Sequence, residues 1–132
     1  MTETPVEQIE GASELAAWFG SFPRLHDANV VEFQLSGEGN GHLTAKAFRM
    51  TDKIDDKGFF VLEKHCLVTL HFNEITTVEL QDFQPGQAIL SDVDITKATS
   101  AFRIEIGSSY GFSGTIVARK LSVSFEPTGD AI

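Results

Sequence analysis

The pattern of apolar and polar residues changes once along this chain, from helical spacing near the N-terminus to strict alternation from Asn29 onward. In the first part, three residues follow the i, i+3, i+4 spacing of one helix face: Leu15, Trp18 and Phe19. Ser13 is placed to cap a helix over 14–19, and Gly20 is placed to end it in the left-handed conformation. The sequence therefore predicts one short helix whose apolar face packs on a sheet.

The alternation after Asn29 is typical of half-buried β-strands. The first apolar face consists of Val31, Phe33 and Leu35, and the returning strand, after a glycine-rich turn at 37–41, presents Leu43, Ala45 and Ala47. Further strands are predicted at 66–72, 77–83, 89–95, 102–106, 112–118 and 121–125. A charged loop at 51–58, a turn at Pro85 and Gly86, and a turn at 107–111 separate some of them.

Seven or eight strands after one helix predict an α+β fold that is mainly β. We expect an antiparallel sheet, rolled or in two layers, with the N-terminal helix packed on it. The length of 132 residues fits a single domain spanning 1–132, with mobile ends at 1–7 and 128–132.

The net charge of the chain limits the classes of partner that it is expected to bind. Nineteen acidic residues against ten basic ones give a formal net charge of −9, which repels nucleic acids and anionic membrane surfaces. The first five residues lack the order of a secretion signal, and no apolar run reaches the ~18 residues of a membrane span. We therefore expect a cytoplasmic protein with no nucleic-acid or membrane partner.

The sequence predicts no cofactor and no metal. It contains no phosphate-binding loop, dinucleotide fingerprint or paired-cysteine motif, which also argues against an enzyme. His65 and His71 fall on one face of a strand but ~20 Å apart, and His42 is the only other histidine that could pair across with either. The single cysteine, Cys66, lies in an apolar run and is predicted to be a buried core residue.

His26 and Asp27 form the one adjacent pair of titratable residues beside bulky aromatics. Neighbours in an extended segment point to opposite sides, so we do not expect them to bond each other. We predict that His26 packs under the helix with a backbone partner and that Asp27 caps a turn by accepting backbone N–H groups.

Eleven phenylalanines in a small domain indicate a packed core. Any that remain exposed beside acidic side chains would form a mixed apolar and anionic binding face. Phe59 and Phe60, next to the charged loop, are the first candidates. Tyr110, in the predicted 107–111 turn, is a second surface candidate.

The segment 18–31 resembles the start of the immunity protein 50 family, whose members open with an aromatic-glycine, a tryptophan- or phenylalanine-proline and a His-Asp-alanine pattern. The matching residues are Trp18, Phe19, Gly20, Pro23, His26 and Asp27. The segments 78–83 and 104–111 are also similar to such small domains. The resemblance implies a bacterial cytoplasmic protein that neutralises a toxin encoded nearby, by binding and not by catalysis. We predict a structural role for the six matching residues, His26 and Asp27 included.

The leading hypothesis from the sequence is therefore a non-enzymatic immunity protein whose acidic charge attracts a basic toxin. Its candidate contact residues are Asp52, Asp55, Asp56, Phe59 and Glu63. One alternative is a small-ligand-binding or catalytic β domain with His26 in a pocket. Another is a structural domain that forms a homodimer through an exposed sheet edge.

Overall fold

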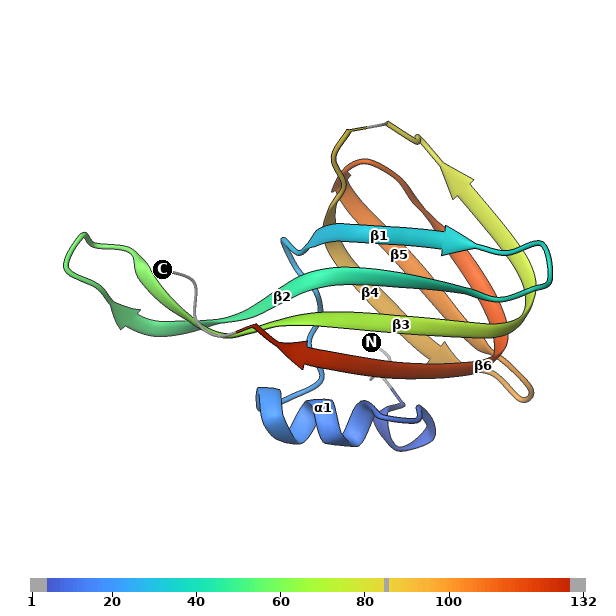
Figure 1. The fold of residues 1–132 in the computed structure, drawn as a ribbon, viewed down its shortest axis with the longest axis horizontal. Coiled ribbons are helices and arrows are strands. Elements are labelled where there is room, and N and C mark those ends of the chain that lie inside the picture. The colour runs from blue at the N-terminus through green and yellow to red at the C-terminus, as the bar shows by residue number, and fades with distance from the viewer. Residues whose placement is uncertain (1–4, 85, 129–132) are drawn as a thin grey trace.

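The computed structural model describes residues 5–84 and 86–128, which form a closed barrel of antiparallel strands with one helix against it (Figure 1). The helical elements are η1 (Val6–Gln8) and α1 (Ala12–Phe19). The strands are β1 (Asn29–Leu35), β2 (Gly41–Ile54), β3 (Phe60–Gln81), β4 (Ile89–Lys97), β5 (Phe102–Tyr110) and β6 (Ser113–Pro127). The predicted fold class, mainly β with one packed helix, is confirmed.

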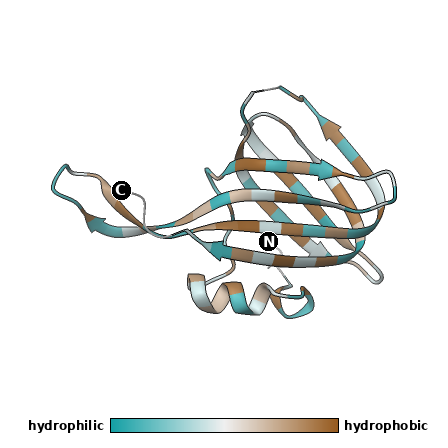
Figure 2. Ribbon diagram, in the orientation of Figure 1, coloured by the Kyte–Doolittle hydropathy of each residue, from teal (hydrophilic) through white to brown (hydrophobic). Residues whose placement is uncertain are grey.

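The barrel has the strand order β1-β2-β3-β6-β5-β4 and is closed by one residue pair, Asn29 of β1 with Ile89 of β4. Apolar and polar residues alternate along the strands, as the bands of Figure 2 show. The predicted inward faces of two strands are confirmed, since all of these side chains are buried: Leu43, Ala45, Ala47, Phe102, Ile104 and Ile106.

Helix α1 packs on the barrel through the predicted face. Leu15 and Phe19 are buried, and the Trp18 ring lies 5.3 Å from that of Phe125 on β6. The end at Gly20 is confirmed, because its φ is +106° and its N–H donates to the carbonyl of Ala16.

The predicted start of the helix was wrong. The residue that precedes the helix is Gly11, with φ +85°, and Ser13 lies inside the first turn. Gly11 lies so close to the carbonyl oxygen of Val123 that a side chain there would collide with it. The close packing of the chain on β6 selects glycine at this position over a side-chain cap.

The structure has six strands where the sequence predicted seven or eight. The predicted strands 66–72 and 77–83 belong to the single strand β3, and 112–118 and 121–125 belong to β6. In β3, Glu74 has φ +54° beside a β-bulge. In β6, the buried positions change from Ile116 and Ala118 to Leu121 and Val123. Both strands bend at these points and continue. The polar residues that predicted a break between two strands therefore lie at a bend within one strand.

Two predicted turns were too long. β2 continues to Ile54, so the predicted loop 51–58 is reduced to a short turn in which Asp55 and Phe59 are bonded through their backbones. β5 continues to Tyr110, and the chain turns at Gly111, with φ +112°. Of the predicted turn at Pro85 and Gly86, Pro85 lies outside the described residues.

The predicted apolar face of β1 was also wrong in part. A bulge between Val30 and Glu32 shifts the alternation, so Val31 is 53% exposed. Phe33 faces inward, where its ring stacks on Phe112 at 4.9 Å. A one-residue shift in a strand moves each later side chain to the other face, which the sequence pattern alone does not show.

The expected mobile ends fall largely outside the described residues, which exclude 1–4 and 129–132. Within the described part, Val6 packs against the core, and the N–H of Thr128 donates to the carbonyl of His65. No helix in the described part of the chain combines the length and apolarity that crossing a membrane requires.

Candidate functional site

A two-stranded ribbon, residues 49–63 of β2, the turn and β3, extends beyond the barrel, at the left of Figure 1. We call it the arm. The neighbouring strands stop before it: β1 last pairs with β2 at Lys46, and β6 last pairs with β3 at Cys66. Lys64, with φ +57° at a bulge, changes the direction of β3 where the arm begins. Both outer edges of the arm are thus left without a strand partner among the described residues.

One face of the arm is apolar. Met50 pairs with Leu62 and Ile54 pairs with Phe60 across the two strands, and cross-strand partners share a face. Phe60 and Leu62 are two residues apart, so the two pairs share the same face. The exposed fractions are 58% for Met50, 63% for Ile54 and 54% for Phe60.

Phe59, at the turn, is 68% exposed. This large apolar side chain lies at the end of the arm, next to the apolar face. The structure thus brings the sequence-predicted candidates Phe59 and Phe60 together with Met50 and Ile54, which were not predicted. Ile54 was missed because it lies within the predicted charged loop 51–58, and Met50 was missed because it directly precedes that loop.

The acidic candidates of the turn have different surroundings. Asp55 Oδ1 accepts hydrogen bonds from the backbone N–H groups of Lys57, at 2.9 Å, and Phe59, at 3.0 Å. Asp55 therefore holds the turn together. Asp52 and Asp56 are exposed and have no side-chain hydrogen bond or ion pair within the described residues.

Glu63 lies at the base of the arm, where its carboxylate is 3.8 Å from Arg49, its cross-strand partner. This pair is on the face opposite Met50 and Leu62. Four acidic and three basic residues give the arm a charge of −1. The electrostatic field that a partner experiences is therefore set mainly by the net charge of −9 of the whole chain and less by the charge of the arm.

The prediction that His26 and Asp27 do not contact each other was wrong. They lie in a turn in which Leu25 and Asp27 both have φ +61°, so the alternation of a strand does not apply. The His26 Nε2 atom is 3.4 Å from Asp27 Oδ2. The expected backbone partner of His26 is confirmed, because its Nδ1 donates to the carbonyl of Ser91 at 2.7 Å.

Two details of the His26 and Asp27 prediction were wrong. The His26 side chain is 72% exposed, so it does not pack under the helix. The described hydrogen bonds of Asp27 include its backbone N–H, which donates to the carbonyl of Leu90, but no turn bond to its carboxylate. The two residues contribute to the wall of a cavity of about 290 Å³, together with Pro23 and Phe19.

The remaining residues of the matched segment have packing roles. Phe19 is buried, Gly20 ends the helix, and Pro23 is buried at the wall of the cavity. Lys64, at the base of the arm, lies 5.1 Å above the ring of Trp18. The segment therefore fixes the end of α1 next to the point where the arm leaves the barrel.

The other histidines lie on β2 and β3. His42 pairs with His71 across β2 and β3, with ring centroids 6.4 Å apart, while the ring of His65 lies next to Phe48. His42 Nε2 contacts the Glu32 carboxylate, and His71 Nε2 is 2.9 Å from the Ser124 hydroxyl. Within residues 5–84 and 86–128, no three His, Cys, Asp or Glu side chains lie close enough together to hold a metal ion.

Cys66 is a core residue, as predicted. Its side chain is buried in the barrel, and burial raises the pKa of the thiol to about 11. Reactivity requires the thiolate, so Cys66 is not placed for nucleophilic chemistry at neutral pH. Tyr110, the other surface candidate, is partly exposed at the end of β5.

Comparison with known proteins adds no functional information. The sequence matches no protein-family model and no curated protein. Among solved structures, the chain is similar to an uncharacterized protein from Neisseria gonorrhoeae, with 17% sequence identity and a TM-score of 0.47. The match covers 77% of this chain and 92% of the other.

Proposed function

We propose that this chain is a non-enzymatic binding protein of the immunity type, which acts in the bacterial cytoplasm and neutralises a toxin by direct binding through the arm. The observation that carries the proposal is the exposed apolar face of Met50, Ile54 and Phe60 on a ribbon outside the barrel. The resemblance of segment 18–31 to the immunity protein 50 family supplies the toxin as the partner.

The form of the arm favours a protein partner over a small molecule. An isolated two-stranded ribbon is only marginally stable in water, and large apolar groups left on it gain free energy when a partner covers them. The unpaired edges of the ribbon offer backbone N–H and C=O groups to a strand of the partner. Apolar anchors with a backbone edge are a common basis for tight protein binding.

The charge of the chain favours a basic partner. A net charge of −9 attracts a cationic surface and speeds association, and Asp52 and Asp56 add free carboxylates beside the apolar face. This account makes the partner's contact surface apolar at its centre and basic at its rim.

A second candidate function rests on the cavity beside His26. Arg24, His26 and Asp27 lie around a space of about 290 Å³, and the bond to Ser91 orients the imidazole. A small polar ligand would fit this geometry. A third candidate is a homodimer, because β1 pairs with β4 only at Asn29, which leaves the rest of its outer edge open among the described residues.

Growth of a host that expresses the neighbouring open reading frames one at a time, with and without this chain, tests the proposal. We expect one neighbour to be toxic and this chain to restore growth against it alone. A set of non-toxic neighbours, or a toxic one that the chain does not counter, would refute the immunity function and shift weight to the His26 cavity or the β1 edge.

A further inference from the structure

The half of β3 that lies farthest from the arm has a free edge. β2 last pairs with β3 at Phe72, whereas β6 continues to pair with β3 as far as Gln81. Residues 76–81 therefore have a strand on one side and, within the described residues, no strand on the other. All six of these residues are exposed. In Figure 1 they belong to the yellow end of β3, on the right of the barrel.

The backbone of this edge can pair with another strand. The carbonyl oxygen of Glu79 faces β6, because a side chain on Gly114 would collide with it. Backbone groups alternate in direction along an antiparallel strand, so the N–H and C=O groups of Val78 and Leu80 point to the free edge. Among the described residues, no turn or loop forms a backbone hydrogen bond with residues 76–81.

The apolar side chains of this edge lack a neighbour. Val78 pairs with Ile116 and Leu80 pairs with Gly114 on β6. Ile116 is fully buried, so Val78 and Leu80 lie on the inner face of the barrel. Val78 is nevertheless 37% exposed and Leu80 is 40% exposed. One more strand on the free edge would cover both side chains.

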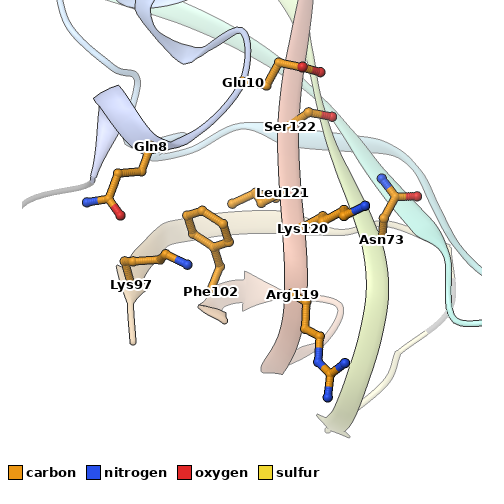
Figure 3. Close-up of a pocket in the computed structure, with 9 residues that line it drawn as sticks. All are labelled: Gln8, Glu10, Asn73, Lys97, Phe102, Arg119, Lys120, Leu121 and Ser122. Carbon is orange, nitrogen blue, oxygen red and sulfur yellow. The ribbon is translucent and has the colours of Figure 1, made fainter. Parts of the chain in front are cut away.

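The chain itself covers other edges of the sheet. On β4, the N–H of Leu90 donates to the carbonyl of Ala28. On β6, Glu10 forms a bridge with Ser122 and covers the edge there (Figure 3). Natural proteins also protect edge strands with lysine, proline or a bulge, and residues 77–81 have none of these. This part of β3 therefore remains open to another strand.

We propose that residues 76–81 pair in antiparallel orientation with the same residues of a second copy and so form a homodimer. Antiparallel pairing of two identical edges has two-fold symmetry, so this edge is complementary to itself. Five of the six side chains are uncharged, which favours a second copy over a basic partner. The pairing joins the sheets of the two copies at the opposite end of β3 from the arm, and it does not depend on the function of the arm.

The charge of Glu79 selects the register of this pairing. With Val78 opposite the partner's Val78, Glu79 lies opposite the partner's Thr77. With Val78 opposite the partner's Leu80, the two Glu79 carboxylates lie opposite each other, which is unfavourable. With Leu80 opposite the partner's Leu80, the pairing would run to Asp82, which lies beyond the end of β3 and has φ +57°. We therefore expect the register with Val78 at the two-fold axis.

Sedimentation equilibrium of the full chain over a wide concentration range tests the dimer. Val78→Lys places a charge at the centre of the pairing, and the matched control is Val31→Lys, because Val31 is 53% exposed on β1. We expect a reversible monomer–dimer equilibrium in the wild type and in Val31→Lys. In Val78→Lys the Kd of the dimer should rise more than roughly tenfold. Circular dichroism checks that each variant is folded.

A second pair of variants tests the register and decides the question if Val78→Lys does not fold. Thr77 is exposed and pairs with Val117 on β6, so a charge there meets no charged cross-strand partner within one copy. Thr77→Arg should tighten the dimer about two- to tenfold through the partner's Glu79, and Thr77→Glu should weaken it by a similar factor.

Four results would overturn the proposal. They are a wild type that stays monomeric at every concentration, a dimer of unchanged Kd in folded Val78→Lys, an equal loss of the dimer in Val31→Lys, and the same change of Kd in Thr77→Arg and Thr77→Glu. An equal loss in Val31→Lys would assign the dimer to the edge of β1.

Discussion

Replacing Ile54 and Phe60 together by serine separates stability from binding. Both side chains are more than half exposed on the arm, so their loss should lower the free energy of unfolding by less than about 1 kcal/mol. Leu70→Ala, in the barrel core, should cost about 3 kcal/mol by comparison.

The same exposure sets the expected effect on affinity. A phenylalanine side chain offers about 200 Å² for burial, so the half that is exposed provides ~2.5 kcal/mol when a partner covers it. The exposed part of Ile54 adds ~1.5 kcal/mol. The sum of ~4 kcal/mol corresponds to a roughly thousandfold rise in Kd, as an upper bound because binding also orders side chains.

Urea unfolding followed by the fluorescence of Trp18, the single tryptophan, measures the stability. Calorimetric titration with the toxin identified by growth rescue measures the affinity. Val31→Ser is the matched control, because Val31 is 53% exposed on β1, outside the arm. A stability loss close to that of Leu70→Ala would show that the arm face is covered in the free protein. An equal loss of affinity in Val31→Ser would remove the arm from the binding surface.

Three further predictions test the fold and the charge. Gly11→Ala should destabilise the protein by more than about 3 kcal/mol in thermal or urea unfolding, because the new methyl group adds a collision with β6 to the strain of a left-handed backbone. Gly58→Ala is the control, since Gly58 has a similar φ but open space around it, and should cost only about 1 kcal/mol. Equal costs for the two variants would contradict the close packing of Gly11 on β6. Burial raises the pKa of Cys66 from 9.0 to about 11, so between these pH values the folded state keeps a proton that the unfolded chain loses. The free energy of unfolding should therefore fall by ~2–3 kcal/mol from pH 9 to pH 11, relative to Cys66→Ala. Parallel pH curves of the two proteins in urea unfolding would refute this. Reversing Asp52 and Asp56 to lysine should slow association with the toxin about two- to tenfold at low salt without unfolding the domain, and an unchanged stopped-flow rate would exclude these carboxylates.

The sequence predicted the fold class and much of the core because alternation reports which side chains face inward. Leu43, Ala45 and Ala47 occupy every second position in the sequence, and all three are buried in the structure. The pattern failed where the backbone leaves regular geometry. A bulge after Val30 exposes Val31, and the corner at Glu74 carries one strand through residues that resemble a loop.

The candidate site was predictable only in part. Phe59 and the acidic residues drew attention because aromatics stood beside charges in the sequence. Their arrangement depends on the continuation of β2 and β3 past the barrel. The sequence did not predict this continuation, because the charged residues between Met50 and Ile54 indicated a loop.

The most direct test of the arm as a toxin-binding surface is growth rescue by three forms of the chain, each expressed with the toxic neighbour: wild type, the Ile54→Ser and Phe60→Ser double variant, and Val31→Ser. The account predicts that wild type and Val31→Ser restore growth and that the double variant, folded and equally abundant, does not. Restoration of growth by the double variant at the wild-type level, or no rescue by the wild type, would contradict it.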